Sequence, residues 1–320
     1  MLRCSLCGRQ AAYNRRYAGV LLCDRCLVKS VERKFRRSVA EHSLISPSEK
    51  IAVAVSGGKD SVSCMHMLAD YCGKKNCELV AITVDEGVKG YRGESVRIAR
   101  ENTELLGVPH FVVSFKQAFG VTLDEMVRIA EKKKTGFGPC TYCGVMRRSL
   151  LNQAARELGA QKLATAHNLD DEVQTIMLNY IRADFSRLYR LGPAYPAREG
   201  FVPRIKPLRE VPEKEMALYA LLKKINVHLG VCPYAGGIHS EIRDFINRLE
   251  ENHTNSKFMM LRMFDRMKPQ LLGAVPEFDM KKCERCGEPT SSESCKACEL
   301  LEGLGFAKSV DLKLIPPAHF

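Results

Sequence analysis

The segment IAVAVSGGKDSVSCMHML, at positions 51–68, joins a strand to a helix through a turn of small and polar residues. Its first five residues are all apolar, as in a strand that is covered on both faces of a parallel sheet. Apolar residues then recur at the spacing of one helical face. Because the first backbone N–H groups of a helix lack partners and the helix dipole favours an anion, such a junction binds phosphate. The segment therefore predicts an α/β fold with a phosphate-binding loop.

The turn itself consists of Ser56, Gly57, Gly58, Lys59, Asp60 and Ser61. Its glycines let the backbone approach a ligand, its serines add hydroxyl donors, and its lysine adds a positive charge. The aspartate is suited to a Mg²⁺ ion that bridges phosphates. An ordinary N-capped helix would need only one of these polar residues. The pattern is not a Walker A motif.

Three further strands are predicted at 79–87, 110–115 and 162–168, with helical stretches between them. This alternation predicts a doubly wound parallel sheet. Ligands bind beyond the carboxyl ends of the strands in such sheets, so Asp85, His167 and Asp171 are expected near the phosphate loop. Each has a plainer interpretation: a turn acid, a polar residue at a strand end, and a charge in the first turn of a helix.

Eight of the 14 cysteines form four Cys-x-x-Cys pairs near the two ends of the chain. Two knuckles of this kind present four thiolates to one tetrahedral zinc ion. We therefore expect a structural zinc ribbon at each end, with two Zn²⁺ ions in all, rather than reduced thiols in apolar clusters. The expected ligands are Cys4, Cys7, Cys23 and Cys26, and Cys283, Cys286, Cys295 and Cys298.

A third cysteine group has three members, Cys140, Cys143 and Cys232. Three thiolates and a water molecule would bind zinc. A four-iron cluster held by three thiolates would instead leave one iron free for an exogenous sulfur atom. A third interpretation needs no metal: Cys140 or Cys143 carries a persulfide that Cys232 resolves as a disulfide. The residues alone leave these interpretations open.

The formal net charge of +12 favours a polyanionic partner, with nucleic acid as the first candidate. Basic residues at 29–37, at 146–148 and between 182 and 198, the last group with Tyr189 and Tyr195, would contact the phosphates of a folded RNA. No apolar run is long enough to span a membrane, and no secretion signal is recognisable. These features predict a soluble cytoplasmic protein.

The chain also resembles a known family over nearly its whole length. The loop SGGKDS is similar to the SGGxDS signature of PP-loop ATP pyrophosphatases, which cleave ATP between its α and β phosphates and usually adenylate a carbonyl oxygen. The two ribbons, PCTYCGVMRR at 139–148, ATAHNLDDEVQT at 164–175 and the late Cys232 together resemble the archaeal and eukaryotic type of tRNA uridine 2-sulfurtransferase. The ribbons distinguish the chain from the related tRNA thiocytidine synthetases, which lack them.

This resemblance implies adenylation of uridine O2 by ATP with Mg²⁺, followed by sulfur transfer to C2. It implies that Lys59, Asp171, Cys140 and Cys232 are catalytic, and that Val84 and Asp85 lie near the adenosine, with His167 also at the ATP site. It further implies that Cys140, Cys143 and Cys232 hold a [4Fe-4S] cluster.

Outside the site, the resemblance implies that tRNA is the substrate. The sulfur donor would be a thiocarboxylated ubiquitin-like carrier or free sulfide, and the protein would be a homodimer. One departure concerns Arg147, because some members have a lysine thought to be catalytic at this position, whereas a guanidinium stays protonated.

The expected organisation is an N-terminal zinc ribbon at 1–30, a basic linker helix at 31–48, a PP-loop domain at 49–208, a helical extension at 209–278 and a C-terminal ribbon with a tail at 279–320. The extension contains a helix that starts at a proline and ends at a glycine, and a later one whose methionines and phenylalanine are expected to pack inward. Two alternatives to a cluster-dependent enzyme stay open: a thiolase that uses a cysteine persulfide, and a zinc-ribbon RNA-binding protein without catalysis. The target uridine, at the wobble position or in the T-loop, also stays open.

Overall fold

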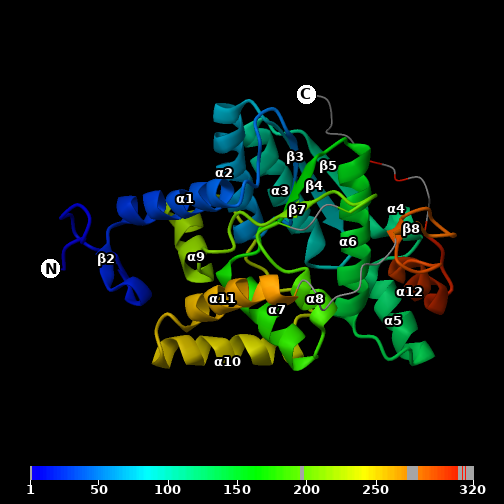
Figure 1. The fold of residues 1–320 in the computed structure, drawn as a ribbon. Helices are drawn as coiled ribbons and strands as arrows, with labels where there is room; N and C mark the ends of the chain where they lie inside the picture. The colour runs from blue at the N-terminus through cyan, green and yellow to red at the C-terminus, as the bar shows by residue number, and fades with distance from the viewer. Residues whose placement is uncertain (1, 195–197, 272–279, 309–311, 313, 315–320) are drawn as a thin grey trace.

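A five-stranded parallel sheet lies at the centre of the computed structural model, which describes residues 2–194, 198–271, 280–308, 312 and 314 (Figure 1). The strand order is β5-β4-β3-β6-β7, so the strand that precedes the phosphate loop, β3, is central. All four neighbouring pairs are parallel. The strands are β3 (Lys50–Ala54), β4 (Glu78–Asp85), β5 (His110–Ser114), β6 (Lys162–Ala164) and β7 (Arg204–Ile205).

Helices cover both faces of this sheet, which confirms the doubly wound α/β prediction. On one face Ile51 and Val53 pack with residues of α1 (Asp24–Glu41), α2 (Lys59–Lys75) and α9 (Glu213–Leu222). On the other face Ala52 and Ile82 pack with residues of α5 (Leu123–Lys133), α6 (Pro139–Glu157) and α12 (Lys296–Leu304). Successive residues of β3 thus enter opposite cores, as the alternation of side chains along a strand requires.

The remaining elements surround the sheet (Figure 1). The helices are α1 (Asp24–Glu41), α2 (Lys59–Lys75), α3 (Arg92–Leu106), α4 (Phe115–Phe119), α5 (Leu123–Lys133), α6 (Pro139–Glu157), α7 (Leu169–Ile181), α8 (Phe185–Tyr189), α9 (Glu213–Leu222), α10 (Ile238–Asn252), α11 (Ser256–Met267) and α12 (Lys296–Leu304). Two short 3-10 helices are η1 (Arg16–Ala18) and η2 (Lys268–Leu271). Each terminal module has a hairpin, formed by β1 (Tyr13–Arg15) and β2 (Val20–Leu22) or by β8 (Lys281–Lys282) and β9 (Pro289–Thr290).

Several predicted bounds differ from the structure. The strand expected at 162–168 ends at Ala164, and the short strand β7 was not predicted. Helix α1 begins at Asp24, within the segment expected to be the first ribbon. The proline-started helix α9 ends at Leu222, well before the glycine expected to end it. Tyr195 lies outside the described residues.

The helices of the predicted extension at 209–278 pack against two different parts of the fold. Helix α9 packs on α1 and α2, whereas α10 and α11 pack on α7. The expectation that the methionines and phenylalanine of α11 pack inward is confirmed for Phe258 and Phe264, which with Leu261 form the buried face of the helix. It was wrong for Met259, Met263 and Met267, which are exposed. No helix in the described ranges has the length and apolar character needed to cross a membrane.

Candidate active site at the carboxyl edge of the sheet

The phosphate loop follows the carboxyl end of β3 and is held by its own serines. The Ser61 hydroxyl accepts a hydrogen bond from the Ser56 N–H at 3.0 Å and donates one to the Gly58 carbonyl at 3.0 Å. Gly57 has a φ of +86°, and a Cβ there would lie 2.2 Å from the carbonyl oxygen of Ser95. Only glycine satisfies both constraints. The loop is therefore tightly curved, and α2 begins at its end.

Lys59, the first residue of α2, forms ion pairs with two carboxylates. Its Nζ lies 2.9 Å from Asp60 Oδ2 and 2.9 Å from Glu213 Oε1 at the start of α9. Burial lowers the pKa of Lys59, but the attraction of Asp60 and Glu213 outweighs it, so the pKa is raised overall. The ammonium therefore stays charged at neutral pH.

Asp60 has one oxygen without a partner. Oδ2 accepts from Lys59, whereas Oδ1 is buried and makes no hydrogen bond. Burial raises the pKa of this carboxyl. A buried carboxylate oxygen without a partner is costly unless it binds a cation, and oxygen is the ligand that Mg²⁺ prefers. This donor fits the predicted Mg²⁺ ion.

Asp171 caps helix α7 and also lies near the Asp60 carboxylate of the phosphate loop. Its Oδ2 accepts from the Asn168 N–H at 3.0 Å, and its own N–H donates to Asn168 Oδ1 at 3.0 Å, so it completes a capping box for α7. Burial, with the nearby charges of Asp60 and Glu213, raises the pKa of Asp171 to about 7. A carboxyl that titrates near neutral pH can accept a proton in a reaction.

The other predicted nucleotide residues lie at the ends of the neighbouring strands. Asp85 Oδ1 accepts from the Gly87 N–H at 2.9 Å, which is the bond of a turn acid. Val84 is buried. His167 Nδ1 lies 2.9 Å from Thr165 Oγ1. Desolvation of the ring by nearby protein atoms lowers the pKa of His167 to about 3, and several cationic side chains contribute to this effect. The imidazole is therefore neutral at neutral pH.

Arg92 is a buried residue of this site that the sequence analysis missed. Its guanidinium donates to the Ser56 carbonyl at 2.8 Å and to the Val84 carbonyl at 3.0 Å. It also lies 2.5 Å from the buried Glu86 carboxylate. Arg92 thus joins the phosphate loop to the end of β4. A lone arginine in an amphipathic helix carries no sequence signal for such a role.

The three central cysteines come from two segments that meet beside the phosphate loop. Cys140 and Cys143 lie in the first turns of α6. Cys140 Sγ lies 3.6 Å from the carbonyl oxygen of Tyr234, two residues after Cys232. Upstream of Cys232, the His228 N–H donates to the Gly57 carbonyl at 2.9 Å. The Cys232 segment therefore runs from the phosphate loop to the start of α6.

The sulfur atoms of Cys140, Cys143 and Cys232 are not gathered as tightly as those of the terminal cysteine groups. Each terminal group has all of its sulfur atoms within 4.8 Å of one another, whereas no such group among the described residues includes these three cysteines. A single zinc ion draws its ligands together, but each iron of a cluster takes its own thiolate. Three thiolates are the donor set that a [4Fe-4S] cluster with one open iron can use.

Arg147 lies one helical turn after Cys143. Its NH1 is 3.7 Å from Glu86 Oε1, so the same buried carboxylate contacts both Arg92 and Arg147. Since Glu86 follows β4, this pair connects the cysteine-bearing helix to the nucleotide edge of the sheet. A lysine at this position could also pair with Glu86, but only arginine keeps a permanent charge.

The terminal cysteines form the two predicted tetrads. Cys4, Cys7, Cys23 and Cys26 lie together at one end of the chain and Cys283, Cys286, Cys295 and Cys298 at the other. In each tetrad the backbone reverses direction at the glycine after the second cysteine. The Gly8 N–H donates to the Cys4 carbonyl at 2.9 Å, and the Gly287 N–H donates to the Cys283 carbonyl at 2.8 Å. Four thiolates at this separation suit one tetrahedral metal ion.

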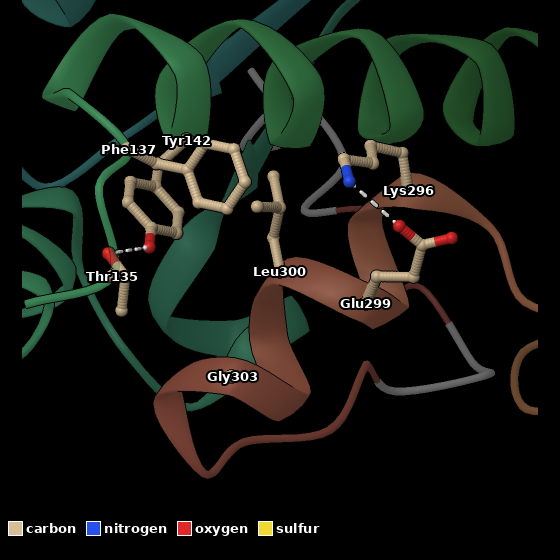
Figure 2. A pocket seen from close by; sticks show the side chains of 7 residues that line it. All are labelled: Thr135, Phe137, Tyr142, Lys296, Glu299, Leu300 and Gly303. Atoms are coloured by element: carbon tan, nitrogen blue, oxygen red, sulfur yellow. Dashed lines mark hydrogen bonds and ion pairs between the residues drawn. The ribbon is translucent and has the colours of Figure 1, made fainter. Parts of the chain in front are cut away.

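The C-terminal tetrad supports the cysteine-bearing helix. Figure 2 shows a small pocket where α12 faces the loop before α6. Lys296 Nζ lies 5.4 Å from the centre of the Phe137 ring, and that ring meets Tyr142 edge-on at 6.2 Å. The pocket has a volume of about 80 Å³, well below that of a site for a nucleotide. It marks a packing contact rather than a substrate site.

Comparison with known proteins gives consistent matches. The model of the PP-loop domain family matches residues 27–228. The tRNA 2-thiolation protein NcsA of Haloferax volcanii is 38% identical, over 95% of this chain and 99% of its own length. A probable sulfurtransferase of Methanocaldococcus jannaschii is 35% identical, over 94% of this chain and 87% of its own.

A solved structure matches equally well. The U34-tRNA thiolase NcsA of Methanococcus maripaludis, determined with its [4Fe-4S] cluster, has a TM-score of 0.83 and 34% identity. The match covers 97% of this chain and 99% of that one. The chain therefore belongs to the PP-loop family and, within it, to the tRNA 2-thiolation proteins.

Proposed function

We propose that the protein is an ATP-dependent tRNA sulfurtransferase that converts the wobble uridine to 2-thiouridine. The observation that carries this proposal is the hydrogen bond between His228 and Gly57, since it ties the segment bearing Cys232 directly to the phosphate loop. ATP chemistry and sulfur chemistry then belong to one site. The choice of the wobble uridine rests on the similarity to the U34-tRNA thiolase.

In the first step, uridine O2 attacks the α-phosphate of ATP and pyrophosphate leaves. The loop N–H groups and the Lys59 ammonium bind the phosphates and stabilise the charge that develops on them. Asp60 is the ligand for Mg²⁺, which its unpartnered Oδ1 supports. Attack by O2 releases the proton on N3 of the base, and Asp171, with a pKa of about 7, accepts it. Val84, Asp85 and His167 line the nucleotide side.

In the second step, a sulfur nucleophile attacks C2 and AMP leaves. Cys140, Cys143 and Cys232 hold the group that presents this sulfur. A [4Fe-4S] cluster held by these three thiolates would supply an open iron for an exogenous sulfur atom. The Glu86 carboxylate pairs with Arg147, one helical turn after Cys143. Burial raises the pKa of the Cys143 thiol to about 11, and the charge of Arg147 opposes this rise. The sulfur donor is either a thiocarboxylated ubiquitin-like carrier or free sulfide.

The other modules serve the tRNA. We propose that each terminal tetrad binds one Zn²⁺ ion and that residues 1–30 and 279–320 are ribbons flanking a PP-loop domain at 49–208. The linker helix, the segment at 209–278 and the net positive charge provide a broad surface for RNA phosphates. We also propose that the protein acts in the cytoplasm as a homodimer.

The test is thiolation of unmodified tRNA by protein purified without oxygen, with ATP and sulfide, read as retardation on a mercury-containing gel. We expect 2-thiouridine at the wobble position with wild type and none after Lys59→Ala, Asp171→Asn or Cys140→Ala. A control variant, Cys77→Ser, should retain activity because Cys77 lies just before β4, at the opposite end of the sheet from the phosphate loop. Its Sγ contacts the Ser46 carbonyl. Thiolation without ATP, or undiminished in Cys140→Ala, would contradict the proposal, and product at a T-loop uridine would reassign the target.

A further inference from the structure

The Lys59 ammonium has two carboxylate partners of different origin. Asp60 is its neighbour in the chain, whereas Glu213 comes from the first turn of α9. One positive charge therefore faces two negative ones at 2.9 Å each. A carboxylate and a phosphate oxygen are alternative acceptors for the same N–H donor.

Glu213 is held in this position by its backbone. Its N–H donates to Asp170 Oδ2 at 2.8 Å, and the other oxygen of Asp170 lies 2.5 Å from Lys257 Nζ in α11. Two residues later, the fully buried Glu215 forms a bidentate pair with Arg15, with both distances 2.8 Å. The first turn of α9 is thus fixed on both sides, which directs Glu213 to Lys59.

The Glu213 side chain nevertheless remains accessible to solvent. It is 39% exposed, compared with 25% for Lys59. An exposed carboxylate can leave its partner at a small energetic cost, because water replaces the lost contact. The orientation of Glu213 toward Lys59 is therefore fixed, but the ion pair is weak enough for another anion to replace the carboxylate.

We propose that Glu213 is a positioning residue that competes with the phosphates of ATP for the Lys59 ammonium. ATP entry exchanges the carboxylate for a phosphate oxygen, and the return of Glu213 to Lys59 helps pyrophosphate to leave after adenylation. This inference rests on the proposed function, in which Lys59 binds the phosphates of ATP.

The experiment measures binding of the α,β-methylene analogue of ATP, whose α–β linkage the enzyme cannot cleave, to the full-length protein without tRNA. Glu213→Gln should tighten binding by about threefold, the effect of an exposed ion pair, and pyrophosphate should become a correspondingly stronger inhibitor of thiolation. Glu213→Asp should restore wild-type values in part. A residue that only supports the fold would weaken binding or leave it unchanged.

Three controls make the result decisive. Glu241→Gln removes the same charge from the exposed first turn of α10 and should leave binding as in wild type. Equal or weaker binding by Glu213→Gln, or equal tightening by Glu241→Gln, overturns the proposal. If Glu213→Gln unfolds at a lower temperature than wild type, Glu213→Ser supplies the same test. Unaltered binding by Lys59→Ala would refute the ATP site itself, and thus the proposed function as well.

Discussion

Replacing Gly57 by alanine tests the conformation of the phosphate loop most sharply. The new Cβ would lie 2.2 Å from the Ser95 carbonyl oxygen, which belongs to the backbone of α3. Alanine in the left-handed region adds about 1–2 kcal/mol, and an overpacked contact adds about 1–3 kcal/mol. We therefore expect the free energy of unfolding to fall by roughly 2–5 kcal/mol.

The same substitution in the neighbouring helix provides the control. Gly73 lies in α2 without a left-handed φ, and a Cβ added there would meet no atom within 4 Å. Gly73→Ala should stabilise the protein by about 0.5–1 kcal/mol, because alanine is the better helix former. Two glycine-to-alanine changes, one just before α2 and one within it, should therefore act in opposite directions.

Urea unfolding followed by circular dichroism measures both effects, and binding of the α,β-methylene analogue of ATP measures the loop. Displaced loop N–H groups should weaken binding by about tenfold or more in Gly57→Ala, since each hydrogen bond to a charged group contributes about 1.5–3 kcal/mol. Gly73→Ala should bind as wild type does. A Gly57→Ala protein with unchanged stability and affinity would refute the described loop conformation.

Three further predictions concern the carboxylates and the tetrads. Because the pKa of Asp171 is raised to about 7, its stabilising contribution is complete below about pH 4 and is lost as the pH rises through about 7. In urea unfolding, the stability of wild type relative to Asp171→Asn should therefore decline over that interval. The rate of thiolation should rise over the same interval, and a rate already maximal at about pH 5 would exclude Asp171 as the base. Glu215→Gln leaves Arg15 and Lys34 without their buried carboxylate and should lower the free energy of unfolding by about 3–5 kcal/mol. Glu299→Gln removes only an exposed ion pair with Lys296 and should change the free energy of unfolding by less than about 0.5 kcal/mol. Equal losses in the two variants would refute the buried ion pairs of Glu215. Metal analysis should find two zinc ions per chain in wild type and in Cys77→Ser, but one zinc ion in Cys7→Ser. Two zinc ions in Cys7→Ser would show that Cys7 is not a ligand.

The sequence predicted what local patterns encode. The loop from Ser56 to Ser61 is a local feature, since the strand, the turn residues and the helix are contiguous. The cysteine tetrads follow from spacing for the same reason. The carboxyl edge of the sheet follows from topology, because parallel strands end together.

What the sequence did not reveal depends on contacts between distant segments. Arg92 and Glu213 look like ordinary charged residues of surface helices, and only the packing of α3 and α9 brings them to the phosphate loop. Strand β7 has two residues, too few for any periodic pattern. The exposed methionines of α11 were misjudged because apolar content alone does not say which helical face is buried.

The measurement that tests the central claim most directly is the iron and acid-labile sulfide content of protein purified without oxygen, for wild type, Cys140→Ala and Cys64→Ala. Cys64 is buried in the opposite core and serves as a matched cysteine control. The cluster assignment predicts about four irons per chain in wild type and in Cys64→Ala, and their loss in Cys140→Ala. Zinc without iron in all three proteins, even after reconstitution, would contradict the cluster and leave a cysteine persulfide as the sulfur carrier.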